Sequence, residues 1–177
     1  MFKSYFSEAV KITDSDRLRD LFSCNNLNIT QNGEVCLVGE ICIGPGVEFR
    51  GRCSIGNGCV IASGSILKNV TLGEKNNLRE YSIVMDSCAG CKNILGPFCF
   101  IRDNCVIKDN CTLGCHTETT RSSFESGVKV SHRAFIGDAT VGANTIIGAG
   151  VTFCNWDGKV HQKISLGSDT TVGSGTS

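Results

Sequence analysis

An aliphatic residue recurs every five or six positions along most of this chain, and that repeat limits the fold more than any other feature. The leading residues run from Leu37 to Val172, usually six positions apart. The spacing shortens to five at four places, after Leu67, Val84, Thr119 and Ile136. Neither the 3.6-residue period of a helix nor the alternation of a hairpin strand gives this pattern, so the internal repeat decides the fold.

One inward-pointing residue in six suits a short strand followed by a bend. Three such units close a triangular coil, and stacked coils pair as parallel strands about 4.8 Å apart. The bends need positive φ, and the position three after each leading residue is often one that tolerates it. These positions are Gly46, Gly58, Gly64, Asn104, Asn110, Gly127, Asn144, Gly150, Asp169 and Gly175. The repeat predicts an all-β parallel β-helix over residues 31–177.

Residues 1–30 lack the repeat and are predicted to form a separate lead segment. Within it, Thr13–Phe22 has capping residues at its start and an apolar stripe at helical spacing. We expect a short N-terminal helix that packs as a lid on the end of the β-helix.

Composition excludes several classes of protein. The formal net charge is +0, which does not indicate a nucleic-acid or membrane-surface partner. The apolar runs are too short to cross a bilayer, and the N-terminus lacks the hydrophobic core of a signal peptide, so we expect a cytoplasmic protein.

The 12 cysteines do not look like a disulfide framework, because several share one place in the repeat. Four positions after a leading residue, a thiol serves as a small filler. The cysteines at that place are Cys53, Cys59, Cys88, Cys99, Cys105 and Cys111. Cys88 and Cys91 form the one CxxC pair, and without a second pair at zinc spacing we predict no metal.

Three histidines are candidates for chemistry. His116 falls on a bend position, where a structural role is expected, and His161 lies in a polar insertion that interrupts the repeat after Phe153. His132 falls two after Val130, where its side chain should point outward. An exposed imidazole can take a proton at neutral pH, so His132 is the candidate general base.

Three segments make the sequence resemble a known family: GPFCFIRDNCVI, SHRAFIGDATVG and NTIIGAGVTFCNWDG, which begin at Gly96, Ser131 and Asn144. They are similar to the acetyltransferase domain of the bacterial bifunctional N-acetylglucosamine-1-phosphate uridyltransferase/glucosamine-1-phosphate acetyltransferase. The resemblance covers about residues 30–177, and the uridyltransferase half has no counterpart here. It implies a left-handed β-helix, a homotrimer with active sites between subunits, and acetyl-CoA as co-substrate, with no metal required.

The same resemblance implies roles for individual residues. His132 matches the general base, and Arg102 matches the arginine that binds the sugar phosphate. Asn155 and Trp156 match a pair beside the acetyl group and the amine. Ala149 and Ser174 match positions that contact acetyl-CoA.

Several substrate positions depart from the family pattern. Thr120 replaces a phosphate-binding lysine, with Arg121 beside it as a substitute. Phe135 replaces a tyrosine, and Thr145 replaces an asparagine. His161 replaces a loop lysine, with Lys163 nearby. Each lost polar contact to a charged ligand costs on the order of 1–3 kcal/mol.

The resemblance therefore implies transfer of an acetyl group from acetyl-CoA directly to an amino-sugar phosphate, with glucosamine-1-phosphate as the first candidate. It also implies that the product feeds UDP-N-acetylglucosamine synthesis, and through it peptidoglycan and lipopolysaccharide. Three alternatives stay open. They are a trimer that kept the coil and lost its activity, an acetyltransferase for another amino sugar, and a zinc hydratase of the γ-carbonic-anhydrase type, which would need three converging histidines.

Overall fold

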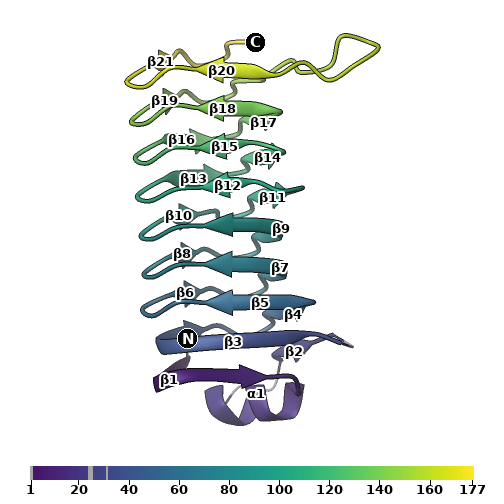
Figure 1. The fold of residues 1–177 in the computed structure, drawn as a ribbon, viewed down its shortest axis with the longest axis vertical. Coiled ribbons are helices and arrows are strands. Elements are labelled where there is room, and N and C mark those ends of the chain that lie inside the picture. The colour runs from purple at the N-terminus through teal and green to yellow at the C-terminus, as the bar shows by residue number, and fades with distance from the viewer. Residues whose placement is uncertain (1, 24–25, 31) are drawn as a thin grey trace.

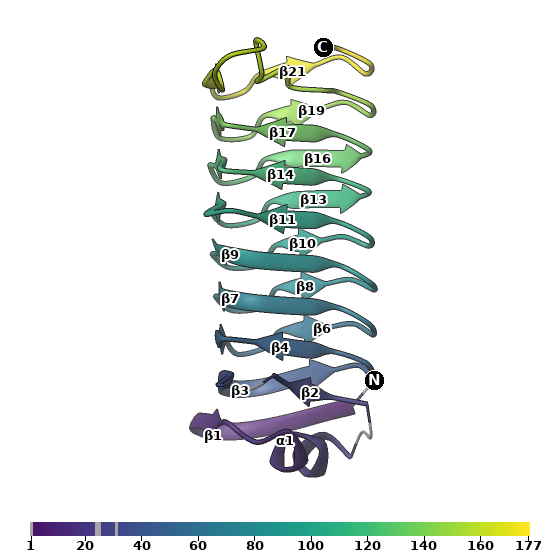
Figure 2. The same cartoon turned by 90° about the vertical axis from the view of Figure 1, so that its right-hand side faces the viewer.

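The chain winds into a three-sided left-handed β-helix of about 7 turns, as predicted. The computed structural model describes residues 2–23, 26–30 and 32–177. The coils stack into one column, with the N-terminal elements at one end and the C-terminus at the other (Figures 1 and 2).

Each side of the column is a ladder of short parallel strands. Face 1 holds β2 (Asn28–Ile29), β4 (Glu48–Arg50), the first halves of β7 (Ile66–Leu72) and β9 (Ile83–Ala89), β11 (Phe100–Arg102), β14 (Glu118–Thr120) and β17 (Phe135–Gly137). Face 2 holds the first half of β3 (Glu34–Ile43), β5 (Arg52–Ile55), the second halves of β7 and β9, β12 (Val106–Ile107), β15 (Ser123–Phe124), β18 (Ala139–Val141) and β20 (Ile164–Leu166). Face 3 holds the second half of β3, β6 (Val60–Ile61), β8 (Asn77–Leu78), β10 (Ile94–Leu95), β13 (Thr112–Cys115), β16 (Lys129–His132), β19 (Ile146–Ile147) and β21 (Thr171–Val172).

The leading residues of the repeat form the core. Every one from Leu37 to Phe153 is buried, including Thr119, the one polar member. Leu166 and Val172, in the last coil, are half-buried because no further coil of the described chain covers them. Burial of this continuous apolar column is the main term that stabilises the fold.

The corners explain the two repeat lengths. All ten Gly, Asn and Asp positions predicted at bends have positive φ, and so does His116 at 55°. Each five-residue spacing has a single turning residue at the corner between faces 1 and 2. These turning residues are Asn69, Asp86, Arg121 and Asp138. The insertion at 154–163 leaves the column at the same corner, which we call the loop corner.

The corner between faces 3 and 1 is called here the histidine corner, because His116 and His132 lie on it. Its turning residues include Tyr81, Phe98 and Arg133, whose φ values are 54°, 55° and 48°. Bulky residues rarely adopt this conformation. At this corner the side chains of successive coils also stack, since the Tyr81 and Phe98 rings lie 5.6 Å apart and nearly parallel.

The N-terminal segment holds the predicted helix and an element that was not predicted. Helix α1 spans Ser15–Phe22, with Asp14 as its N-cap and Leu18 and Phe22 buried. Before it, β1 (Phe2–Ile12) pairs antiparallel with β3. The expectation of a helix alone was therefore incomplete. Strand β1 lacks the six-residue repeat, and it forms by pairing with the free edge of β3.

One cysteine departs from its predicted place. Five of the six cysteines expected as fillers are buried, whereas Cys88 is exposed. The five-residue spacing after Val84 puts Cys88 directly before the next leading residue, Ala89, where side chains point outward. Every cysteine in the described ranges is a free thiol.

Candidate functional site

The loop corner carries a network of charged side chains that spans three coils. Arg102, at the end of β11, donates a hydrogen bond to Glu118 at 2.9 Å and another to Asp103. One coil further on, Arg121 donates two hydrogen bonds to the carboxylate of Asp138, from Nε at 2.6 Å and from Nη2 at 2.8 Å. Such two-point pairing fixes both side chains in orientation.

Thr120 joins the two arginine pairs. Its hydroxyl donates to Asp103 at 2.9 Å and accepts hydrogen bonds from Arg102 and Arg121, at 3.2 and 3.0 Å. These bonds lower the pKa of the Asp103 carboxyl, first through Thr120 and then through Arg102. Thr120 is 1% exposed, so its side chain lies inside this network and links the two arginine pairs.

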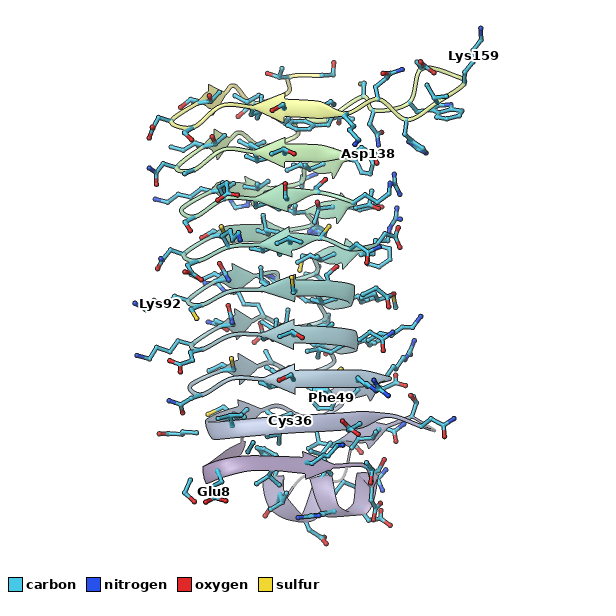
Figure 3. All side chains as sticks on the ribbon, in the orientation of Figure 1. Glu8, Cys36, Phe49, Lys92, Asp138 and Lys159 are labelled. Atoms are coloured by element: carbon cyan, nitrogen blue, oxygen red, sulfur yellow. The ribbon has the colours of Figure 1, made fainter. Side chains whose placement is uncertain are left out.

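Asp138 fastens the 154–163 loop to the column. Its carboxylate accepts a hydrogen bond from the Asn155 side chain at 2.6 Å and lies 3.4 Å from Nδ1 of His161. Hydrogen bonds from Arg121 first, and from Asn155, lower the pKa of Asp138 to about 2. Figure 3 places Asp138 at the base of the loop and Lys159 at its far end. The loop is therefore anchored at its root.

The loop root is packed closely against face 1. A Cβ added to Gly137 would lie 2.4 Å from Nδ2 of Asn155 and 3.0 Å from Cζ of Phe135. Phe135 thus leans over Gly137 toward Asn155, which is 6% exposed. Further out, the rings of Trp156 and His161 lie 5.0 Å apart, and Trp156 is 54% exposed.

A cavity lies beside this network on face 2. Its volume is about 440 Å³, and Arg121, Asp138 and Lys163 are among the residues that line it. The nearby network has two arginines, Arg102 and Arg121, against three carboxylates, Asp103, Glu118 and Asp138, an excess of one negative charge. A bound phosphate would have to displace a carboxylate from Arg102 or use a further cation such as Lys163.

The histidine corner holds a second group of predicted residues. His132, Ala149 and Ser174 each fall two after a leading residue, in successive coils, and all three are exposed. Backbone hydrogen bonds link their coils, from Gly150 N to His132 O and from Gly175 N to Ala149 O. Within the described residues the imidazole of His132 has no hydrogen-bond partner.

The two groups do not meet within one chain. Arg102, Arg121, Asn155 and His161 gather at the loop corner, whereas His132 lies across face 1 at the histidine corner. Strand β17 separates His132 from Asp138 along the chain.

Thr145 does not lie on the surface as a substrate contact would. It is 0% exposed, and its hydroxyl donates to the Gly167 carbonyl at 2.9 Å. It falls four after Val141, the inward filler position of the repeat. The outward side chain beside it is Ile146, which is 45% exposed.

Asp103, Glu118 and Asp138 were not among the predicted site residues. The sequence does contain a signal for two of them, because Asp103, Arg121 and Asp138 recur at 17- or 18-residue intervals, one coil apart. Stacking the coils at that interval would have placed the guanidinium of Arg121 between the carboxylates of Asp103 and Asp138.

The three histidines do not converge in this chain. His116 and His132 lie at the histidine corner, whereas His161 lies at the loop corner beside Asp138. No group of three or more His, Cys, Asp or Glu side chains that could hold a metal ion occurs among residues 2–23, 26–30 and 32–177. No helix in these ranges is long and apolar enough to cross a membrane.

Comparison with known proteins gives a consistent set of relatives. No family model matches the chain. It is 37% identical over 131 residues to bifunctional protein GlmU from Listeria monocytogenes, which covers 74% of this chain and 28% of that protein. It is 33% identical over 132 residues to GlmU from Anaeromyxobacter sp., covering 75% and 27%. The match to GlmU from Prochlorococcus marinus is 32% over 186 residues, covering 91% and 41%. The chain thus spans well under half the length of these relatives.

A solved structure of a Bacillus cereus gene product aligns with a TM-score of 0.44 and 14% identity. The alignment covers 82% of this chain and 71% of that one.

Proposed function

Because this chain is a relative of one part of bifunctional protein GlmU, as its motifs indicated, we propose that it is an acetyltransferase that uses acetyl-CoA. The acceptor in this proposal is the amine of an amino-sugar phosphate, with glucosamine-1-phosphate as the first candidate. The product would enter UDP-N-acetylglucosamine synthesis in the cytoplasm, and through it peptidoglycan and lipopolysaccharide.

The observation that carries the proposal is the imidazole of His132, which is exposed and has no hydrogen-bond partner among the described residues, in a β-helix whose sequence is similar to that of GlmU. The amine of the acceptor attacks the thioester carbonyl carbon of acetyl-CoA, and His132 takes the proton that the amine loses. The carbon–sulfur bond of the thioester breaks, and CoA leaves. Neither a covalent intermediate nor a metal is needed for this direct transfer.

Asn155 has a role that its hydrogen bonding supports. Because its Nδ2 donates to Asp138 at 2.6 Å, the orientation of the amide is fixed. Its Oδ1 is then left to accept a hydrogen bond from the attacking amine, which orients the lone pair. Trp156 flanks this group on the exposed side of the loop.

The remaining ligand contacts follow from position. Ala149 and Ser174, in the coils beyond His132, would contact acetyl-CoA. Phosphate would be held from the loop corner by Arg102 and Arg121, with Lys163 and His161 adding positive charge. Phe135 would close the apolar side of the sugar.

Separation of the two corners supports active sites between copies of the chain. We assign a homotrimer in which the histidine corner of one chain faces the loop corner of the next. His132 and Asn155 then meet across an interface, although face 1 separates them in a single chain.

A second candidate is acetylation of a different amino sugar. It is favoured by the burial of Thr120 and Thr145, and by the carboxylates that already occupy Arg102 and Arg121. An acceptor with a weaker negative charge would not need to displace them.

Thiol release from acetyl-CoA in the presence of glucosamine-1-phosphate tests the proposal. We expect turnover in the native chain and a loss on the order of 100-fold or more in His132→Ala, since a general base contributes that much. Lys92→Ala, at the corner between faces 2 and 3 and away from both groups of site residues, is the control and should retain activity. Turnover that survives His132→Ala would contradict the assigned base. A folded chain that does not bind acetyl-CoA would contradict the function.

A further inference from the structure

Cys115 and His116 form a thiol–imidazole pair at the histidine corner. Sγ of Cys115 lies 2.8 Å from Nδ1 of His116. Strand β13 ends at Cys115, and the positive φ of His116 turns the chain so that its ring swings back over the preceding thiol. The backbone N–H of His116 also donates to the Pro97 carbonyl at 3.3 Å, which holds the turn against the neighbouring coil.

The imidazole is held in place by an aromatic stack. The ring of Phe98 lies 5.3 Å from that of His116, at an angle of 29°, and Tyr81 stacks on the other face of Phe98. These three side chains occupy the same corner position in successive coils. A nucleophile beside a base whose ring is oriented by a third group is the arrangement of an activated nucleophile.

The thiol also lies next to the proposed general base. Cys115 and His132 are register partners in the parallel pairing of β13 with β16, one coil apart. Both line a cavity of about 250 Å³, together with Arg79, Gly96 and Ser131. An acyl group on Cys115 would therefore lie within reach of His132.

We propose that Cys115 is an acyl-accepting thiol, which takes an acetyl group from a thioester when no amine is bound. This inference rests on the proposed function for the identity of the donor. Sγ of Cys115 attacks the thioester carbonyl carbon while Nδ1 of His116 takes the thiol proton. The carbon–sulfur bond to CoA then breaks, and the leaving CoA sulfur receives that proton from His116. The products are S-acetyl-Cys115 and free CoA, with His116 returned to its starting state.

Three features separate the half-buried thiol of Cys115 from the two exposed thiols of the described chain, Cys88 and Cys154. Cys88, on face 2, is more exposed to solvent than Cys115, but its thiol has no hydrogen bond to any histidine of the described chain. Cys154 is also exposed, and the hydrogen bond of its thiol within the described chain goes to a backbone carbonyl, that of Thr152 at 3.9 Å. Neither has an adjacent base, an orienting ring and a register partner such as His132.

The test is incubation of the full chain with acetyl-CoA, without any amine, followed by mass spectrometry of the intact protein and of its peptides. We expect one acetyl group on Cys115, absent from Cys115→Ser and retained by the control Cys88→Ser. In His116→Asn, acetylation should slow on the order of 100-fold, because the base is lost. Asn tolerates the positive φ at this corner, so the variant keeps the turn.

A parallel incubation with a small acetyl thioester that lacks the nucleotide separates this inference from the proposed function. Acetylation of Cys115 by the small thioester supports the pair even if the chain fails to turn over glucosamine-1-phosphate. No adduct on Cys115 with either donor overturns the inference, even if turnover that depends on His132 is normal. Equal labelling of Cys88 and Cys115, or an unchanged rate in His116→Asn, overturns it as well.

Discussion

The side-chain amide of Asn155 donates a 2.6 Å hydrogen bond to the carboxylate of Asp138, which joins the root of the loop to the column. Asp138 is itself the turning residue of its coil at the loop corner, and it accepts hydrogen bonds from Arg121 of the preceding coil. The position of Asn155 is thus set by a carboxylate that does not belong to the loop.

We expect Asp138→Ala to release the loop while leaving the column folded. Breaking this partly buried, charge-assisted network costs about 1–3 kcal/mol locally. Trp156, the single tryptophan, reports the change by a shift in its fluorescence. Asp86→Ala is the matched control, because Asp86 turns the same corner lower in the column and pairs with Asn69 instead of a loop. A Trp156 signal that responds equally to both variants would contradict the anchoring role.

Acid should release the same contact within a defined pH range. The pKa of Asp138 is lowered to about 2 from its ordinary 3.8, so its stabilisation is complete above about pH 4 and is lost as the pH falls through 2. The shift corresponds to about 2 kcal/mol. Trp156 fluorescence followed from pH 5 downward measures it, and Asp138→Asn should flatten that transition. A transition at the same pH in Asp138→Asn would assign it to another group.

Gly137→Ala should displace Asn155. Its Cβ would come within 2.4 Å of Nδ2 of Asn155, closer than real Cβ contacts allow. We expect a loss of activity on the order of 100-fold, since small misplacements near the chemistry have effects of this size. Gly167→Ala is the control, because its Cβ would meet nothing nearer than 3.9 Å. Wild-type turnover by Gly137→Ala would mean that Asn155 need not hold this position.

Mixing two inactive variants should restore activity if the sites lie between chains. His132→Ala damages the histidine corner and Asn155→Ala the loop corner. After equal random mixing, roughly a quarter of the interfaces carry both native side chains in a cyclic oligomer. Turnover of mixed and unmixed samples at equal total concentration measures the recovery. A mixture as inactive as its components, with subunit exchange verified, would place the whole site in one chain.

Much of the fold could be predicted from spacing alone. The leading residues from Leu37 to Phe153 are buried as the repeat predicted, and the positive-φ corners lie where Gly, Asn or Asp follows at the third position. These features are local, since each depends on one unit of the repeat. Strand β1 could not be predicted in the same way, because its partner is an edge supplied by β3.

The candidate site was predicted less completely, and for a physical reason. Outward positions such as His132 follow from the repeat, but pairing between coils does not. Asp138 and Arg121 meet only when the chain is stacked at the length of one coil, which needs three units and their exact lengths. For Thr145 the repeat was the better guide. Its position in the repeat is an inward one and it is 0% exposed, whereas the family resemblance implied a contact with the substrate.

The antiparallel strand β1 has a consequence for self-assembly. The first coil of a parallel β-helix presents backbone donors and acceptors that could template a coil from another molecule and so begin a fibre. Here β1 runs across two faces of that end in the opposite direction and occupies the edge of β3. On these two faces a second column cannot add a parallel strand to β3, so β1 blocks that route to end-to-end growth.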